Sequence, residues 1–353
     1  MRDEIRQQPE TLERTLKEEW AHARSLRQYF ERNPPRLIVL AARGTSDNAA
    51  QFGRYLLEIT TGIPVSLAAP SVVTLYRAKV QLKDAVVVAI SQSGESTDTN
   101  LVLEEARAVG AFTIGITNES ESTLARLAEH ALLVRAGKER SVAATKTYTG
   151  QLLCFYLLAH ALGGAIELSD LERVPDWTRD ALQLEDEIRT RSERYCFMQH
   201  AVSVGRGLNY SNSFEFALKL METCYVVAER FSPADLLHGP IAMLERSFPA
   251  FLFCPPGVTW KPMCELLEKL SAIGAETLAI TDRSNPHVAG ANGLTAQPLT
   301  ISAEIGKPGA VAEELYTPIP YIIPAQLFAA SLAEVKRLDA DRPRTLSKVT
   351  QTM

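Results

Sequence analysis

The sequence predicts an α/β protein built from two doubly wound units, each a parallel sheet flanked by helices. Short runs that are apolar at every residue, such as 86–90, alternate with segments of helical character. Strands that are buried on both faces of a parallel sheet carry runs of this kind. Both halves of the chain open with a strand, a glycine-containing turn and a helix, which favours duplication of one fold. A length of 353 residues accommodates two domains of ordinary size.

The first half is expected to begin with a helical arm that ends at Asn33, because Pro34 and Pro35 cannot continue a helix. Strands are then expected at residues 37–42, 63–67, 85–90, 112–116 and 131–134. Helices are expected between and after them at 46–60, 98–109, 122–129 and 144–162.

The second half is expected to open with a strand and a glycine turn over 201–207 and a helix over 213–229. Further strands are expected at 250–254, 276–281 and 297–301, and further helices at 260–272 and 319–336. The expected organisation is a helical N-terminal arm over 1–35, a first domain over 36–165, a helical linker over 166–195, a second domain over 196–340 and a tail over 341–353.

The composition is that of an ordinary globular enzyme, with 46% hydrophobic and 22% charged residues. The net charge of −5 and the lack of a basic stripe argue against nucleic acid as a partner. The first residues form no apolar signal core, and no uninterrupted apolar stretch reaches 18 residues, so we expect neither a signal peptide nor a membrane span. The five cysteines lack CxxC spacing, so we expect reduced, mostly buried thiols in a cytoplasmic protein.

Two loops of small polar residues follow two of the expected strands. Gly44, Thr45 and Ser46 follow the first strand, and residues 91–96 follow the third. A loop that leads into a helix presents free backbone N–H groups, and hydroxyl groups add donors without adding charge. The two loops therefore predict a phosphate-bearing small molecule at the carboxyl edge of a parallel sheet. For the first loop taken alone, helix capping is the more ordinary explanation. Neither loop matches the Walker A or the dinucleotide-binding pattern.

A third polar stretch, 142–147, precedes the expected helix at 144–162 and is a candidate to close over a sugar. Lys146 within it either approaches the phosphate or is a solvated charge at a helix N-terminus. The sequence alone favours the solvated charge.

Candidate acid–base groups lie in the second half. Lys219 and Glu222 are three residues apart on one expected helix, and Glu215 lies one turn earlier. A surface ion pair is the ordinary explanation, but the apolar residues around them indicate a buried helix, where a carboxyl group can move protons. His238 lies in a turn fixed by glycine and proline, which suits a placed imidazole. No residues have the spacing of metal ligands, so neither a metal nor another cofactor is expected.

Short strings of these and neighbouring residues lie in order along the chain at 44–46, 91–96, 136–146, 217–222, 237–240 and 346–350. Together they resemble the SIS (sugar isomerase) superfamily, over most of the chain from residue 36 onward. The chain is similar to the isomerase half of glucosamine-6-phosphate synthase and to stand-alone SIS-type glucosamine-6-phosphate deaminases. The resemblance implies two tandem SIS domains of the flavodoxin-like type.

The resemblance also implies a role for each matching residue. The substrate- and phosphate-binding residues would be Gly44, Thr45, Ser46, Ser91, Gln92, Ser93, Ser96, Val142 and Ala144. Glu222 would move a proton between C1 and C2 of the open-chain sugar, with Lys219 supporting its carboxylate. His238, in this family often from the neighbouring subunit, would assist ring opening. Lys348 on the tail would close over the site.

The activity that the resemblance implies is conversion of glucosamine 6-phosphate to fructose 6-phosphate and ammonia, by a homodimer whose site is shared between subunits. Alternatives in the same class are a galactosamine phosphate substrate, deglycation of a fructosamine phosphate, and the isomerase subunit of a synthase that uses external ammonia. Residues 1–35 contain no cysteine and are too few for a glutaminase domain, so glutamine use by this chain alone is not expected. Ser96 and Ala144 stand where the synthase has a threonine and a serine, and the alanine removes one contact. A non-catalytic sugar-phosphate sensor is the alternative of another class, although Glu222, His238 and Lys348 argue for catalysis.

Overall fold

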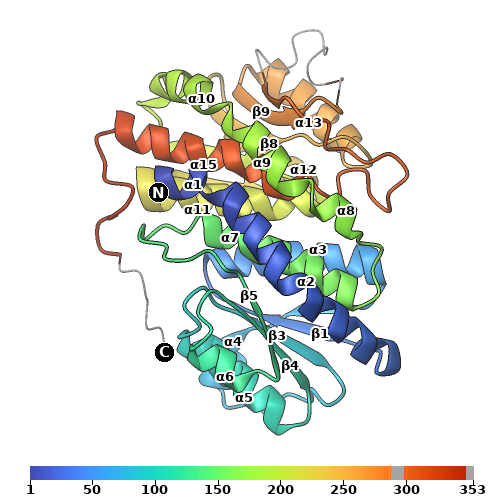
Figure 1. Cartoon of the computed structure of the whole chain (residues 1–353). Helices are drawn as coiled ribbons and strands as arrows, with labels where there is room; N and C mark the ends of the chain where they lie inside the picture. Colours follow the sequence, from blue (N-terminus) through green and yellow to red (C-terminus); the bar gives the residue numbers. More distant parts are fainter. Residues whose placement is uncertain (286, 288–297, 347–353) are drawn as a thin grey trace. The chain divides into compact units, whose positions relative to one another are not determined.

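The structure, a computed structural model, describes residues 1–285, 287 and 298–346 (Figure 1). The chain divides into two compact units. The first unit consists mainly of Gln7–Arg140 and Ala144–Arg173, and the second mainly of Val174–Arg344 with Met1–Arg6 and Ser141–Ala143. Each unit contains a five-stranded sheet in which all paired strands are parallel.

The first unit has its strands in the order β2-β1-β3-β4-β5. These strands are β1 (Ile38–Ala41), β2 (Val65–Leu67), β3 (Val86–Ile90), β4 (Phe112–Thr117) and β5 (His130–Leu133). Its helices are α2 (Gln8–Arg32), α3 (Thr45–Thr61), α4 (Pro70–Thr74), α5 (Thr97–Ala108), α6 (Thr123–Leu127), α7 (Lys146–Ala161) and α8 (Leu168–Leu171). The strand order reverses between β1 and β3, and doubly wound sheets bind their ligands at this switch point.

The five strands expected in this unit are all present. Every residue of β1 and β3 is buried, which explains their continuous apolar runs. The expected helices are present as α2, α3, α5, α6 and α7. The sequence does not predict α4, because its five residues are too few to show a helical period.

The second unit has its strands in the order β10-β9-β8-β6-β7. Read from β7, this is the order of the first unit, with β6 in the place of β1 and β7 in the place of β2. These strands are β6 (His200–Val204), β7 (Val227–Phe231), β8 (Pro249–Phe253), β9 (Glu276–Asp282) and β10 (Leu299–Ile301). Its longer helices are α9 (Val174–Leu182), α10 (Glu185–Ser192), α11 (Tyr210–Cys224), α13 (Trp260–Ile273) and α15 (Pro318–Val335); the shorter ones include α1 (Arg2–Arg6) and α12 (Pro233–Leu237). The expected fold class, two α/β units of one topology, is confirmed, and the switch point of this unit lies between β6 and β8.

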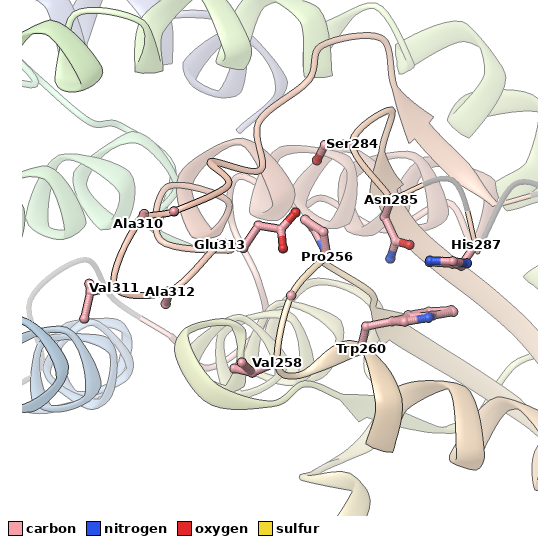
Figure 2. Close-up of a pocket in the computed structure, with 12 residues that line it drawn as sticks. Pro256, Val258, Trp260, Ser284, Asn285, His287, Ala310, Val311, Ala312 and Glu313 are labelled. Carbon is pink, nitrogen blue, oxygen red and sulfur yellow. The ribbon is translucent and has the colours of Figure 1, made fainter.

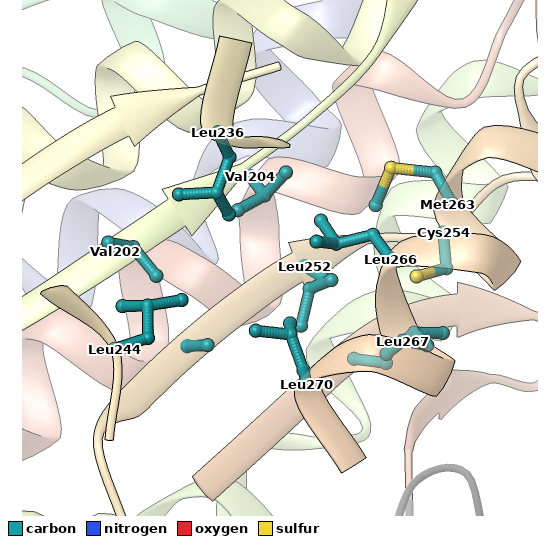
Figure 3. Packing of buried hydrophobic residues seen from close by; sticks show 12 residues of the cluster. Val202, Val204, Leu236, Leu244, Leu252, Cys254, Met263, Leu266, Leu267 and Leu270 are labelled. Atoms are coloured by element: carbon teal, nitrogen blue, oxygen red, sulfur yellow. The ribbon is translucent and has the colours of Figure 1, made fainter. Parts of the chain in front are cut away.

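The core of the second unit packs β6 and β8 against α13 (Figure 3). Val202, Val204, Leu252, Leu266 and Leu270 are fully buried members of this core. Truncating one such leucine to alanine costs about 2–5 kcal/mol. The helix α15 is buried along most of its length and packs against α9, α10 and α11. Within the described ranges, no helix is both long enough and apolar enough to span a bilayer.

One element of the second unit differs from the expectation. The helix expected over 213–229 ends at Cys224, because Tyr225 takes the left-handed conformation with φ at 54°. Residues 227–231 instead form β7, an edge strand in which Val227, Glu229 and Arg230 are exposed. β7 therefore lacks the continuous apolar run that marks the buried strands, and the sequence pattern extends the helix over it.

Candidate functional site

The loops after β1 and β3 lie side by side at the carboxyl edge of the first sheet. β1 pairs directly with β3, with Leu40 opposite Val88, so both strands end at the same edge. The loop after β1 leads into α3 at Thr45, and the loop after β3 leads into α5 at Thr97. Two helix N-termini therefore flank the switch point of this sheet, an arrangement that favours anions. We call residues 44–46 and 91–96 the hydroxyl loops.

In the first hydroxyl loop, Ser46 is held as a donor. Its Oγ accepts a hydrogen bond of 3.0 Å from Nε2 of Gln151, a buried residue of α7. Because the oxygen is used as an acceptor, the hydroxyl proton is left to donate to a ligand. Gln151 is thus a positioning residue for Ser46 that the sequence does not reveal.

In the second hydroxyl loop, two serine hydroxyl oxygens are likewise used as hydrogen-bond acceptors. Ser91 Oγ accepts from the Gly94 N–H at 3.1 Å, and Ser93 Oγ accepts from the Glu95 N–H at 3.2 Å. Both hydroxyl protons therefore remain for donation. Gly94 has a φ of +66°, and a Cβ at this position would lie 2.1 Å from Ser122 Oγ, so only glycine fits.

The remaining members of this loop have local partners. Ser96 shares a hydrogen bond of 2.9 Å with Thr99 Oγ1. The backbone carbonyl of Gln92 accepts from Thr117 Oγ1 at 3.3 Å. The first unit thus brings together seven of the expected binding residues: Gly44, Thr45, Ser46, Ser91, Gln92, Ser93 and Ser96.

Arg43 is a residue of this site that the sequence reasoning missed. Its Nε and Nη2 donate to Oδ2 of Asp98 at 3.0 and 2.6 Å. Arg43 follows β1 and Asp98 is buried in the first turn of α5, so the ion pair joins the two hydroxyl loops. About half of the Arg43 side chain is exposed, and its further N–H groups suit an anion. The available signal is that Arg43 directly precedes the first hydroxyl loop, whereas neither loop itself contains Lys or Arg.

The third polar stretch differs from the hydroxyl loops. Glu139 occupies the N-terminus of α7, where its Oε1 accepts from the backbone N–H groups of Thr145 and Thr147 at 3.0 and 3.2 Å. The expectation of a solvated Lys146 is wrong, because Lys146 is buried and its Nζ donates to Gln7 Oε1 and to the Lys138 carbonyl, both at 2.9 Å.

Val142 and Ala144, the two expected binding residues of this stretch, fall in different units. Val142 belongs to the second unit, where its N–H donates to the carbonyl of Asp341 at 3.1 Å. Ala144 belongs to the first unit and is half-buried just before α7. Their contact with a sugar stays a prediction.

In the second unit, α11 carries a buried charge cluster. Lys219 Nζ lies 2.6 Å from Glu222 Oε2 and 3.4 Å from Glu215 Oε1. Lys219 and Glu215 are fully buried, whereas about a quarter of the Glu222 side chain is exposed. Burial alone would lower the pKa of Lys219, but the carboxylates of Glu215 and then Glu222 outweigh it, and the net pKa is raised. Lys219 is therefore a fixed cation that orients Glu222.

The other two expected catalytic residues are placed separately. His238 is exposed at the end of α12, where its backbone N–H donates to the carbonyl of Ala234 at 3.1 Å. In the part of the chain that the structure describes, no hydrogen bond or ion pair joins His238 to Glu222. Lys348 lies outside the described residues, so its role stays a prediction.

Two doubly wound units, one with donor-rich loops at its switch point, define a two-domain α/β protein with a candidate anion site. The chain belongs to the SIS domain family, whose model matches residues 33–161 and 198–305. The glutamine–fructose-6-phosphate aminotransferase (isomerizing) of Pyrococcus horikoshii is 35% identical over 317 residues, which are 88% of this chain and 51% of that protein. The chain thus spans about half the length of the curated relatives it matches.

Two solved structures show the same architecture. The C-terminal domain of glucosamine-fructose-6-phosphate aminotransferase from Francisella tularensis matches with a TM-score of 0.85 and 26% identity, over 96% of both chains. The glucosamine-6-phosphate deaminase of Thermotoga maritima matches with a TM-score of 0.70 over 96% of this chain and 100% of its own. At 20% identity, the likeness to the deaminase shows the fold alone.

Proposed function

We propose that this chain is a sugar-phosphate enzyme that converts glucosamine 6-phosphate and water to fructose 6-phosphate and ammonia. The hydroxyl loops bind the phosphate, and Glu222 moves a proton between neighbouring sugar carbons. The curated relative is named for a reaction on fructose 6-phosphate, which the proposed reaction forms.

The observation that carries the proposal is the state of Glu222. Its Oε2 accepts from a fully buried ammonium at 2.6 Å, while the side chain is still about a quarter exposed. An isomerisation through an enediol-type intermediate needs one base that removes a proton and returns it to the next carbon. A carboxylate that is held through one oxygen, with the other oxygen left for the substrate, suits this task.

The proposed steps balance as follows. With the sugar ring open, Glu222 removes the proton on C2 and returns it to C1. In the same isomerisation O1 gains a proton and the amine on C2 loses one, so that the C1 aldehyde becomes an alcohol and C2 becomes an imine. Water adds to the imine and ammonia leaves, which gives the ketose. His238 and Lys348 assist ring opening. We also propose that the active protein is a homodimer, which light scattering tests.

The first experiment measures ammonia and fructose 6-phosphate release from glucosamine 6-phosphate in D₂O. Equal release of both products, with partial protium retention at C1 of the product, supports a single base that carries the proton. Turnover without ammonia, or sugar-phosphate binding without turnover, contradicts the proposal, and the latter favours a sensor. Galactosamine 6-phosphate and a fructosamine phosphate, run in parallel, test the alternative substrates.

A second candidate is the isomerase part of a glucosamine-6-phosphate synthase. The 35% identity to the Pyrococcus horikoshii aminotransferase favours it. The reaction is the same one in reverse, so the residues keep their roles. Fructose 6-phosphate with ammonium chloride would then give glucosamine 6-phosphate, and the ratio of kcat/KM values in the two directions distinguishes the candidates.

A further inference from the structure

We propose that the second unit holds a separate ligand site, at the carboxyl ends of β8 and β9, for a small amine-bearing polyol of the amino-sugar class. A pocket of about 550 Å³ opens there (Figure 2). Its lining includes residues 256–258 after β8, Trp260 at the start of α13, Asn285 after β9, and Glu313. We call this the acceptor pocket. None of these residues takes part in the proposed reaction.

Asn285 gives the first indication of a ligand. It is 1% exposed, and its Nδ2 donates to the carbonyl oxygens of Cys254 and Pro255 at 3.1 and 3.2 Å. Its Oδ1 has no hydrogen-bond partner among the described residues, although Asn285 lines the pocket. A buried acceptor without a donor costs free energy, which a ligand hydroxyl or amine removes by donating to it.

The charge of the lining selects the kind of ligand. The half-buried Glu313 lines the pocket, whereas the neighbouring Glu314 is buried outside the lining, and burial raises the pKa of its carboxyl group. Gly257 has a φ of +91°, and a Cβ there would lie 2.7 Å from Glu314 Oε2. This glycine therefore lets the loop after β8 approach the carboxylate closely. The described lining contains one carboxylate, one histidine (His287) and no Lys or Arg, so the pocket favours a cation and disfavours phosphate.

Trp260 supplies the apolar part of the site. Its side chain is half-buried and lines the same pocket as Asn285 and Glu313 (Figure 2). The aliphatic face of a sugar ring packs well on an indole, and an ammonium group is attracted both to the indole and to a carboxylate. An amino sugar combines this face with hydroxyl donors for Asn285 and an ammonium for Glu313.

The test uses the three tryptophans as probes. Protein labelled with 5-fluorotryptophan gives a ¹⁹F resonance for each tryptophan, and Trp260→Phe assigns the one in the acceptor pocket. Glucosamine should shift the Trp260 resonance in a saturable way, glucose should bind more weakly, and inorganic phosphate should leave the resonance unmoved. A Trp260 resonance that glucosamine does not move overturns the proposal, as does one that glucose or phosphate moves equally well.

Variants separate a specific site from weak surface binding. Glu313→Gln should weaken glucosamine binding about tenfold or more, because a charge-assisted hydrogen bond is lost. Glu265→Gln removes an exposed carboxylate of α13 and is the matched control, expected to bind as the unaltered protein does. Equal binding by both variants overturns the role of Glu313. The readout is Trp260 itself, so the result does not depend on whether the proposed reaction occurs.

Discussion

The two units share one strand order but carry opposite chemistry at the carboxyl edges of their sheets. In the first unit, the loops at the switch point present serine hydroxyls and Arg43. In the second unit, the corresponding region around β8 presents the carboxylate of Glu313 in the same pocket as Trp260. Both candidate sites lie at the carboxyl ends of sheet strands, although the acceptor pocket lies at β8 and β9 and not at the switch point between β6 and β8. The loop residues determine the charge of the ligand. The duplicated fold is thus expected to separate binding of an anion from binding of a cation.

The largest expected effect concerns catalysis in the second unit. Glu222→Gln should lower kcat by about 10²–10⁴-fold, because the amide cannot remove the proton. Binding of fructose 6-phosphate, measured by calorimetry, should change little, since the proposed phosphate contacts are those of the hydroxyl loops in the first unit. Glu229→Gln, on the exposed face of β7, is the control and should keep full activity. A Glu222→Gln protein with near-normal kcat would remove Glu222 from the reaction.

The next effect concerns stability and tests the charge cluster of α11. Lys219→Met leaves Glu215 buried without its cation, so the free energy of unfolding should fall by about 3–5 kcal/mol. The double variant Glu215→Gln with Lys219→Met also removes the uncompensated carboxylate of Glu215. It should recover most of the lost free energy of unfolding, while activity stays low. Urea unfolding measures both. A loss of only about 1 kcal/mol or less, as for exposed ion pairs, would contradict the fixed-cation role.

The apolar runs show why most of the fold is predictable from the sequence. β1 and β3 are buried at every residue, so their consecutive positions are all apolar and the sequence reveals them as strands. β7 escapes the prediction because it is an exposed edge strand that continues a helical pattern. For β7 the limit is thus set by solvent exposure: three of its five residues are exposed, so it lacks the apolar run that marks the buried strands.

The candidate site also has parts that the sequence predicts and parts that it does not. The hydroxyl loops are predictable because they directly follow strands, whereas the pairing of Arg43 with Asp98 depends on β1 lying beside β3. The burial of Lys146 depends on partners at Gln7 and Lys138, which no local pattern reveals. That Oδ1 of Asn285 is buried without a partner among the described residues becomes apparent only once the chain is folded. Contacts between distant segments are therefore the part that the sequence alone conceals.

A smaller effect sharpens the contrast in charge between the two edges. Arg43→Ala should raise KM for the sugar phosphate about tenfold or more, since it removes a cation beside the hydroxyl loops and leaves Asp98 buried without its partner. Arg43→Lys should recover only part of this loss, because an ammonium lacks the fork geometry. Arg54→Ala, on the exposed side of α3, is the control. Steady-state kinetics with an unchanged KM for Arg43→Ala would leave the anion site to the hydroxyls alone.

The smallest effect is a difference in acid sensitivity between the units. In the first unit, His130 lies 3.3 Å from His22 through their ring nitrogens, and burial followed by His22 lowers the pKa of His130. The unfolded chain, with a histidine pKa of about 6.5, then takes up protons before the folded chain does. Stability of the first unit should therefore be fully present at higher pH and decrease as the pH falls through this range.

His130→Phe tests this origin, because it keeps a ring against Phe112 and removes the titrating group. Hydrogen exchange of β5 and β9 at several pH values follows the two units separately. The variant should flatten the pH dependence of β5 and leave that of β9 unchanged, whereas His200→Phe, at an exposed position of β6, should alter neither. An acid response of β5 that survives in His130→Phe would place its origin in other groups of the first unit, such as the Glu19–Arg135 ion pair.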